Sequence, residues 1–497
     1  MKRLLASFGV IALVACTTAQ APEKAAPAEV PITSKSPEAI EHFKKGRDLA
    51  DNIRYPEATA ELNQAIKLDP DFALAYAYRG IATTGPRGVA DLEQANTKAR
   101  ATVTAPTGAQ SPAVSNAERL FIEALLIGRR GESAKSEALY RQVIDAAPAD
   151  WRAHMGLAQQ LTFQDKLKET IEELNKALAI NPDAGPVYNA LGYAHFAQGE
   201  TGPAVEALKK YASLNPNEPN PHDSLGEALM AAGDFEQAEA EFRKALELSP
   251  QFDVAWQGVA YTKFFRRDWA GGKEAMAEGR KAATRPADRA QHDILTAVAS
   301  LAEGKSADGL KQINAIQTSA DATIIDMAFV PAWRAMLAVE SSKKSDAIAD
   351  AERALASGTS GKLPPFASAN LRRAALAIRA AAEGLSADAA GAEKTVAALQ
   401  KEASARPDDP NLQSAVHFAQ GMLAVAQKDL KAARAHFDQC AATDTYCHWQ
   451  SFNASRKAAD RAGADASRVR LARMYLRDPL YLYARSSVDK LTPKQSN

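Results

Sequence analysis

The chain has 497 residues, of which 46% are hydrophobic and 24% are charged, so it can bury a large core. Its 60 basic residues balance 60 acidic ones, which argues against nucleic acid as an obligatory partner. An aromatic fraction of only 7% and abundant alanine favour closely packed helices over sheets.

The N-terminus has the form of an export signal. Two basic residues are followed by an apolar run from Leu4 to Ala15, which is too short to span a bilayer comfortably. The ending Leu-Val-Ala-Cys resembles the bacterial lipobox, which implies that residues 1–15 are a lipoprotein signal peptide and that Cys16 is lipidated. An ordinary signal peptide with an incidental cysteine is the alternative. Thr17 stands where an Asp usually marks inner-membrane retention, so the resemblance implies the periplasmic face of the outer membrane.

The next segment, residues 16–36, is rich in proline and alanine and has no apolar periodicity. We expect it to be a disordered tether between the lipid and the folded body.

Residues 37–285 contain repeats. Each unit has two stretches with apolar or small residues at helical spacing, separated by a turn and ended by proline. Between Asp183 and Pro250 the period is 34 residues, as shown by these pairs: Leu191 and Leu225, Gly192 and Gly226, Gly199 and Gly233, Ala204 and Ala238, Leu208 and Phe242, Pro216 and Pro250.

The second unit is looser than the others. Its second helix is predicted at Val89–Thr104, after a turn at Gly85–Gly88, and a loop at Pro106–Ser115 delays the third unit. No convincing strand is predicted anywhere in the chain.

The 34-residue helix–turn–helix unit and its residue pattern resemble the tetratricopeptide repeat. The resemblance implies an all-α fold, a right-handed α-solenoid of helix pairs with a concave groove, and a binding role without catalysis. After Pro286 the period fades while the helical pattern continues, so residues 286–497 are predicted to be a degenerate helical-repeat domain. A pair of closing helices is expected at Tyr446–Val488, where Tyr475, Tyr481 and Tyr483 cover the last open face.

No motif for catalysis, metal binding or phosphate binding stands out. Four histidines, His42, His154, His222 and His417, occupy a repeat position that Tyr or Trp fills in other units, so they are interpreted as packing residues. No metal, no cofactor and no enzymatic activity are therefore expected.

The concave groove is the predicted partner-binding site, because the first helices of such solenoids line it. In each first helix, the residues one turn around from the pair that packs on the second helix (Leu191-Gly192 and its equivalents) should face the groove. Three consecutive first helices thus give three tiers of groove residues: Asn189, Tyr193 and Phe196; Asp223, Glu227 and Met230; Gln257, Tyr261 and Phe264. An ordinary solvated surface is the alternative. Exposing this many apolar and aromatic side chains together is costly. We therefore expect either a ligand or a neighbouring part of the chain to cover them.

The groove lacks the Lys and Arg residues with which related solenoids clamp acidic peptides. Asp223 and Glu227 favour an extended, neutral-to-basic segment lying across Asn189–Phe265. The predicted function is a lipid-anchored periplasmic scaffold or adaptor that binds a protein or peptide of an envelope assembly pathway. A structural oligomerisation module, and an enzyme with its site in the divergent half, are the rival hypotheses.

Two cysteines remain if Cys16 is acylated. Cys440 lies late in a predicted helix and Cys447 begins the next one, which allows a disulfide in an oxidising compartment. Two buried free thiols are the alternative.

Overall fold

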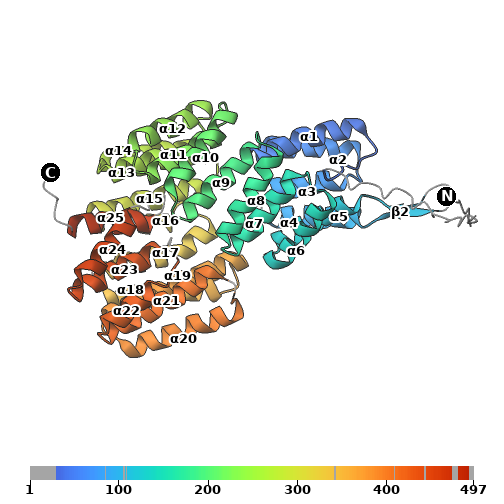
Figure 1. Cartoon of the computed structure of the whole chain (residues 1–497). Coiled ribbons are helices and arrows are strands. Elements are labelled where there is room, and N and C mark those ends of the chain that lie inside the picture. The colour runs from blue at the N-terminus through green and yellow to red at the C-terminus, as the bar shows by residue number, and fades with distance from the viewer. Residues whose placement is uncertain are drawn as a thin grey trace, which may run out of the picture.

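The computed structural model describes residues 29–491, except 84, 105, 106, 108, 341, 342, 408, 442, 443 and 473–478. This part of the chain is almost entirely helical and confirms the predicted all-α solenoid of helical repeats (Figure 1). Among the described helices, none is both long and apolar enough to cross a bilayer. The predicted signal peptide, Cys16 and the first part of the predicted tether lie outside the described residues.

From residue 37 to residue 285 the helices form consecutive pairs joined by short turns. They are α1 (Pro37–Asp51) with α2 (Tyr55–Leu68), α3 (Ala73–Ala82) with α4 (Gly85–Ala99), α5 (Asn116–Arg129) with α6 (Ser133–Ala146), α7 (Trp151–Phe163) with α8 (Leu167–Ile180), α9 (Gly185–Ala197) with α10 (Thr201–Leu214), α11 (Pro219–Ala231) with α12 (Phe235–Leu248), and α13 (Asp253–Phe265) with α14 (Trp269–Ala282).

The two helices of a pair approach closely at the glycine of the first helix. A Cβ atom on Gly226 would lie 2.8 Å from the ring of Phe242, and one on Gly192 would lie 2.5 Å from Cγ of Leu208. Phe242 is fully buried, as is Ala238 one turn earlier on the same helix. The absent side chain therefore lets a large apolar residue of the second helix fill the space between the pair, which stabilises it by roughly 1.5–3 kcal/mol.

The turn inside each pair has a fixed backbone conformation. Gly199 and Gly233 have positive φ angles of 77° and 83° at this repeat position. The equivalent position carries Ile53 in the first repeat, with φ 65°, and Asp165 in the fourth, with φ 58°. The repeat geometry thus imposes a left-handed residue even where the side chain disfavours it.

The second repeat departs from the prediction in two ways. Gly85–Gly88 opens helix α4 and is not a separate turn, and α4 ends at Ala99, earlier than expected. The predicted loop contains a hairpin of two short antiparallel strands, β1 (Thr102–Thr104) and β2 (Gln110–Pro112), although no strand was predicted. Such short, alternation-poor strands carry little sequence signal.

The second half of the described chain begins with a helix that packs directly against the last repeat. Its helices are α15 (Pro286–Glu303), α16 (Ser306–Ile316), α17 (Ile324–Glu340), α18 (Lys344–Thr359), α19 (Pro365–Leu385), α20 (Ala389–Ala405), α21 (Pro410–Ala426), α22 (Leu430–Phe437), α23 (Thr445–Lys457), α24 (Arg461–Ala472) and α25 (Pro479–Leu491). Leu295 and Ala299 of α15 belong to the same buried cluster as Phe264 of α13.

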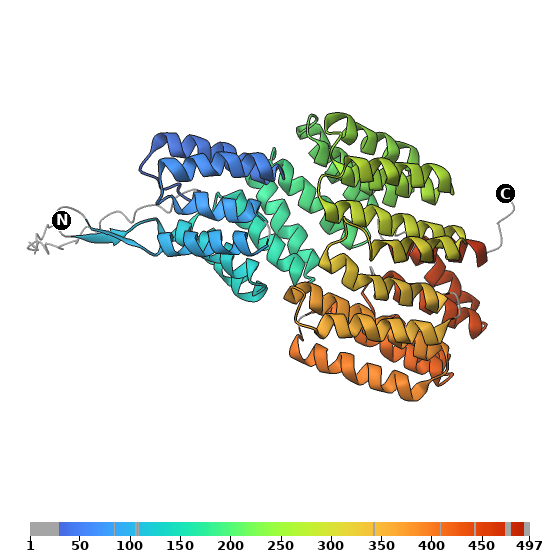
Figure 2. The same ribbon diagram turned by 180° about the vertical axis from the view of Figure 1, so that it is seen from behind.

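The C-terminus contains three helices, where a closing pair was predicted. The last of them, α25, returns to pack against α13, α15 and α23 (Figures 1 and 2). Just before α23, Cys440 and Cys447 are joined by a disulfide with a Cα–Cα distance of 6.3 Å, linking the segment after α22 to the first turn of α23. Tyr475 lies outside the described residues.

Candidate binding groove

The first predicted tier lies on α9 and includes the most exposed of the nine predicted groove side chains. Tyr193 is 39% exposed, while Asn189 and Phe196 are partly buried. The Tyr193 hydroxyl donates a hydrogen bond of 2.7 Å to Oε2 of Glu227 on the next first helix, and it lies 3.3 Å from Oγ of Ser224. This contact holds the exposed ring at the junction of two consecutive repeats.

The second tier, on α11, is mostly inside the protein. Asp223 is 4% exposed and Met230 is fully buried, so neither offers a surface to a partner. Only Glu227 is partly exposed. Two carboxylates, Asp223 and Glu227, were expected to face a ligand in this tier. Only that of Glu227 can do so, because Asp223 is buried.

The third tier, on α13, is covered by the chain itself. Tyr261 is 1% exposed and Phe264 is 2% exposed, while Gln257 is partly buried. Phe265, the residue after Phe264, packs against Tyr481 of α25 with 5.6 Å between ring centroids. Leu482 of α25 joins the same buried cluster as Tyr261. A ligand or a neighbouring part of the chain was expected to cover these side chains. At this end of the groove, a neighbouring part of the chain covers them.

Residues 30–35 lie along the turns that precede the first helices of the second and fourth repeats. The backbone N–H of Val30 donates to Oδ2 of Asp150 at 3.0 Å, and that of Lys35 donates to Oδ2 of Asp69 at 2.9 Å. The Ser34 hydroxyl donates to the same Asp69 oxygen at 2.6 Å. Val30 and Ile32 pack against the core of the first repeats. Residues 29–36 were assigned to the disordered tether, so the tether is shorter than predicted at this end.

One carboxyl group under this segment has an unusual pKa. Glu118, in the first turn of α5, is fully buried. Burial raises its pKa to about 8, and Thr33 of the N-terminal segment offsets only part of that rise. Asp69 caps the end of α2, Glu118 lies in the first turn of α5 and Asp150 caps the start of α7. Asp69 and Asp150 hold the extended segment by accepting its backbone hydrogen bonds.

Away from the covered α13 end, exposed aromatic side chains remain. Phe163, the last residue of α7, is 57% exposed. It holds the repeat position of Phe265, three periods of 34 residues later, where the ring packs against Tyr481. Phe163 and Tyr193 are thus exposed on consecutive first helices. The three tiers predicted from the sequence did not include Phe163, although its spacing from Phe265, three periods of 34 residues, can be read from the sequence.

Arg152, one repeat before the first tier, is not available as a free cation. Its guanidinium pairs with Asp51 of α1 at 2.8 Å and lies 4.1 Å from the ring centroid of Trp151. Arg54 of the first repeat reaches Glu218 at the start of α11 at 3.1 Å. The first repeat therefore contacts the fourth and the sixth directly.

Three of the four repeat-position histidines contact a glutamate of their own repeat. His42, His154 and His222 lie 2.6, 2.7 and 2.6 Å from Glu61, Glu173 and Glu241 respectively, each 19 residues further on. His417 stacks on His436 with 6.3 Å between ring centroids. These contacts join the first helix of a pair to the second, as the packing interpretation requires.

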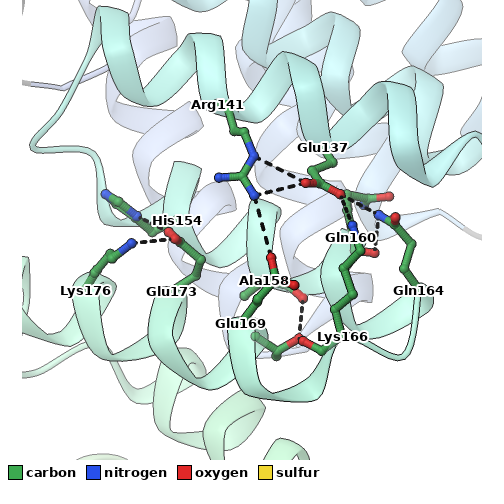
Figure 3. Close-up of polar contacts among 11 residues, drawn as sticks. Glu137, Arg141, His154, Ala158, Gln160, Gln164, Lys166, Glu169, Glu173 and Lys176 are labelled. Atoms are coloured by element: carbon green, nitrogen blue, oxygen red, sulfur yellow. Dashed lines mark hydrogen bonds and ion pairs between the residues drawn. The ribbon is translucent and has the colours of Figure 1, made fainter.

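Figure 3 shows the His154–Glu173 pair with Lys176, beside a second polar network at the turns. In that network Glu137 of α6 accepts hydrogen bonds from Lys166 at 3.0 Å and Gln164 at 2.9 Å. Burial alone would raise the pKa of Glu137, but the hydrogen bonds from Lys166, Gln164 and Arg141 outweigh it and lower that pKa to about 2. The network joins α6 to the turn between α7 and α8.

Models of the tetratricopeptide repeat match residues 123–185, 185–218 and 219–252. No curated protein matches the sequence. Similar solved structures include PilW, a type IV pilus biogenesis factor (17% identity, 41% of this chain and 96% of that one, TM-score 0.36), and PilF of Pseudomonas aeruginosa (17%, 42% and 94%, TM-score 0.34). Another is YrrB, a tetratricopeptide-repeat protein with an unusual peptide-binding site (18%, 34% and 86%, TM-score 0.29).

Proposed function

We propose that this chain, whose residues 123–252 match models of the tetratricopeptide repeat, serves as a protein–protein interaction scaffold and binds a partner segment on the exposed first-helix faces of α7 and α9. The site comprises Phe163, Tyr193 and Phe196, with Glu227 beside them. It is shorter than the sequence-predicted span because α25 covers the α13 end. The role is binding and not catalysis.

The observation that carries this proposal is the exposure of Phe163. At the same repeat position, Phe265 is packed against an aromatic ring supplied by α25. Phe163 and Tyr193 offer comparable rings to solvent, and aromatic anchors of this kind dominate binding energy at protein interfaces. Glu227, which already accepts the Tyr193 hydroxyl, favours an extended segment that is neutral or basic at this point.

A Phe163→Ala/Tyr193→Ala double variant tests the site. Partners are captured from detergent-solubilised membranes after cross-linking and quantified by mass spectrometry. Each truncated anchor is expected to cost about 2 kcal/mol, so capture of a specific partner should fall by more than tenfold. Leu248→Ala is the matched control, because Leu248 is 38% exposed at the end of a second helix. Unchanged capture by a folded double variant would place the site elsewhere.

The setting proposed for this scaffold is the periplasmic face of the outer membrane, in an envelope assembly pathway, with Cys16 as the lipid anchor. The charged start, the short apolar run and the lipobox-like ending support the anchor. The Cys440–Cys447 disulfide fits an oxidising compartment. Replacing Cys16 by Ala should release the protein from the membrane fraction, and a Thr17→Ala control should stay bound. Sedimentation of the Cys16→Ala protein with the outer membrane would remove the basis for the anchor.

A further inference from the structure

The strands of the β-hairpin in the second repeat are not buried against the body of the protein. Every residue of its strands Thr102–Thr104 and Gln110–Pro112 is exposed, and Val103 alone exposes 46% of its surface. Figures 1 and 2 show the hairpin projecting away from the helices. An isolated two-stranded hairpin is at best marginally stable in water, so further strand pairing would stabilise this one.

The strand register shows which edge is open. Ala113 N–H donates to the carbonyl of Ala101 at 2.9 Å, so Ala101 and Ala113 form a hydrogen-bonded pair. The next pair, Thr102 with Pro112, is then a non-hydrogen-bonded pair. The backbone N–H and C=O groups of Thr102 and Thr104 therefore point away from β2. On the opposite edge Pro112 has no N–H to offer, which blunts β2.

The open edge carries no charge. From Ala101 to Ala117 the sequence contains no Asp, Glu, Lys, Arg or His, in a chain with 24% charged residues. Natural proteins commonly protect exposed edge strands with charged side chains, which repel or solvate an approaching strand. Nothing of that kind prevents β1 from meeting an identical strand.

We propose that β1 is a self-association edge, on which two copies of the chain pair their β1 strands antiparallel about a two-fold axis through Val103. In this register Thr102 of one copy exchanges backbone hydrogen bonds with Thr104 of the other, and the reverse. The two Val103 side chains become neighbours in a non-hydrogen-bonded pair and lose their exposure. Pro112 at each outer edge stops the sheet from growing further, so the contact closes at two copies.

Cysteine cross-linking of the full-length protein tests this register. In a non-hydrogen-bonded antiparallel pair, Cβ atoms lie about 4.5–5.5 Å apart, so Val103→Cys should form a disulfide-linked dimer under mild oxidation. Gln110→Cys, equally exposed but on β2, is the matched control. The wild-type chain, in which Cys440 and Cys447 are already joined to each other, gives the background.

A second variant separates edge pairing from random collision. Thr104→Pro, added to Val103→Cys, removes an outward N–H but none of the inward bonds of the hairpin. Dimer formation should fall at least about tenfold, because each copy loses a hydrogen bond of roughly 1 kcal/mol. Equal cross-linking at positions 103 and 110, no effect of Thr104→Pro, or a product with the mass of another polypeptide would each overturn self-pairing through β1.

Discussion

Phe265, at the end of the seventh first helix, meets Tyr481 of the last helix with ring centroids 5.6 Å apart and planes at 71°. These residues are 216 positions apart in the chain. Tyr481 is fully buried, and its hydroxyl donates to the carbonyl of Leu471 at 2.6 Å. Two contacts of Tyr481 therefore hold helix α25 in place: its ring packs against Phe265 and its hydroxyl bonds to Leu471. The face of α13 beneath α25 is closed to partners.

Replacing Tyr481 by Ala should loosen α25 from α13. Truncating a buried aromatic residue commonly costs 3–5 kcal/mol, and here the acceptor at Leu471 would also lose its donor. Hydrogen exchange followed by mass spectrometry should show faster exchange in residues 479–491 and 253–265. Tyr193→Ala is the control, because it truncates an exposed tyrosine on α9. If α25 in the variant were as protected as in the wild type, Tyr481 would not be what holds α25 against α13.

The repeat architecture was predictable because it is a local property. Leu191-Gly192 and Leu225-Gly226 mark equivalent positions in adjacent units, and each unit folds from residues close in sequence. The occupancy of the groove was not predictable in the same way. Val30 reaches Asp150 and Phe265 reaches Tyr481, and neither contact has a periodic signal. Which first-helix side chains stay exposed therefore depends on tertiary contacts that no single repeat encodes.

The turn residue Ile53 provides a stability prediction. It adopts φ 65°, which costs a β-branched residue roughly 1–2 kcal/mol, and its side chain is 40% exposed. Ile53→Gly should therefore raise the free energy of unfolding by about 1 kcal/mol, as measured by urea denaturation. Gly199→Ala is the reverse control: it places a side chain at φ 77° with no atom within 4 Å, and it should destabilise the protein. A loss of stability in Ile53→Gly would show that relieving the backbone strain at φ 65° does not stabilise this turn.

The disulfide predicts a chemical outcome. Without reduction, Cys440 and Cys447 of the mature protein should resist alkylation, and intact-mass analysis should find neither modified. After reduction in denaturant both should react. The bond closes a short loop, so a Cys440→Ser/Cys447→Ser variant is expected to lose about 2–3 kcal/mol, mainly in the helices around α22 and α23. Two modified cysteines in unreduced protein would disprove the bond.

Glu118 predicts how the stability of the N-terminal repeats depends on pH. Its pKa is raised by burial to about 8, whereas an exposed glutamate titrates near about 4.3. The folded state therefore binds this proton more tightly than the unfolded state does. It follows that the free energy of unfolding falls as pH rises from about 4.3 to about 8, by at most about 1.4 kcal/mol per pH unit.

Glu118→Gln removes this titration while keeping the shape of the side chain. The variant should lack that fall in stability between pH 5.5 and pH 8.5 and should be more stable than the wild type at the higher pH. Because Glu118 lies beside Thr33, hydrogen exchange of residues 29–36 should also become less dependent on pH after correction for intrinsic rates. Glu123→Gln is the control: Glu123 lies on the same helix, is only partly buried and pairs with Arg100 and Arg119, and its variant should keep the wild-type slope. Wild-type and Glu118→Gln proteins with equal pH slopes would show that the carboxyl group is ionised in the folded protein.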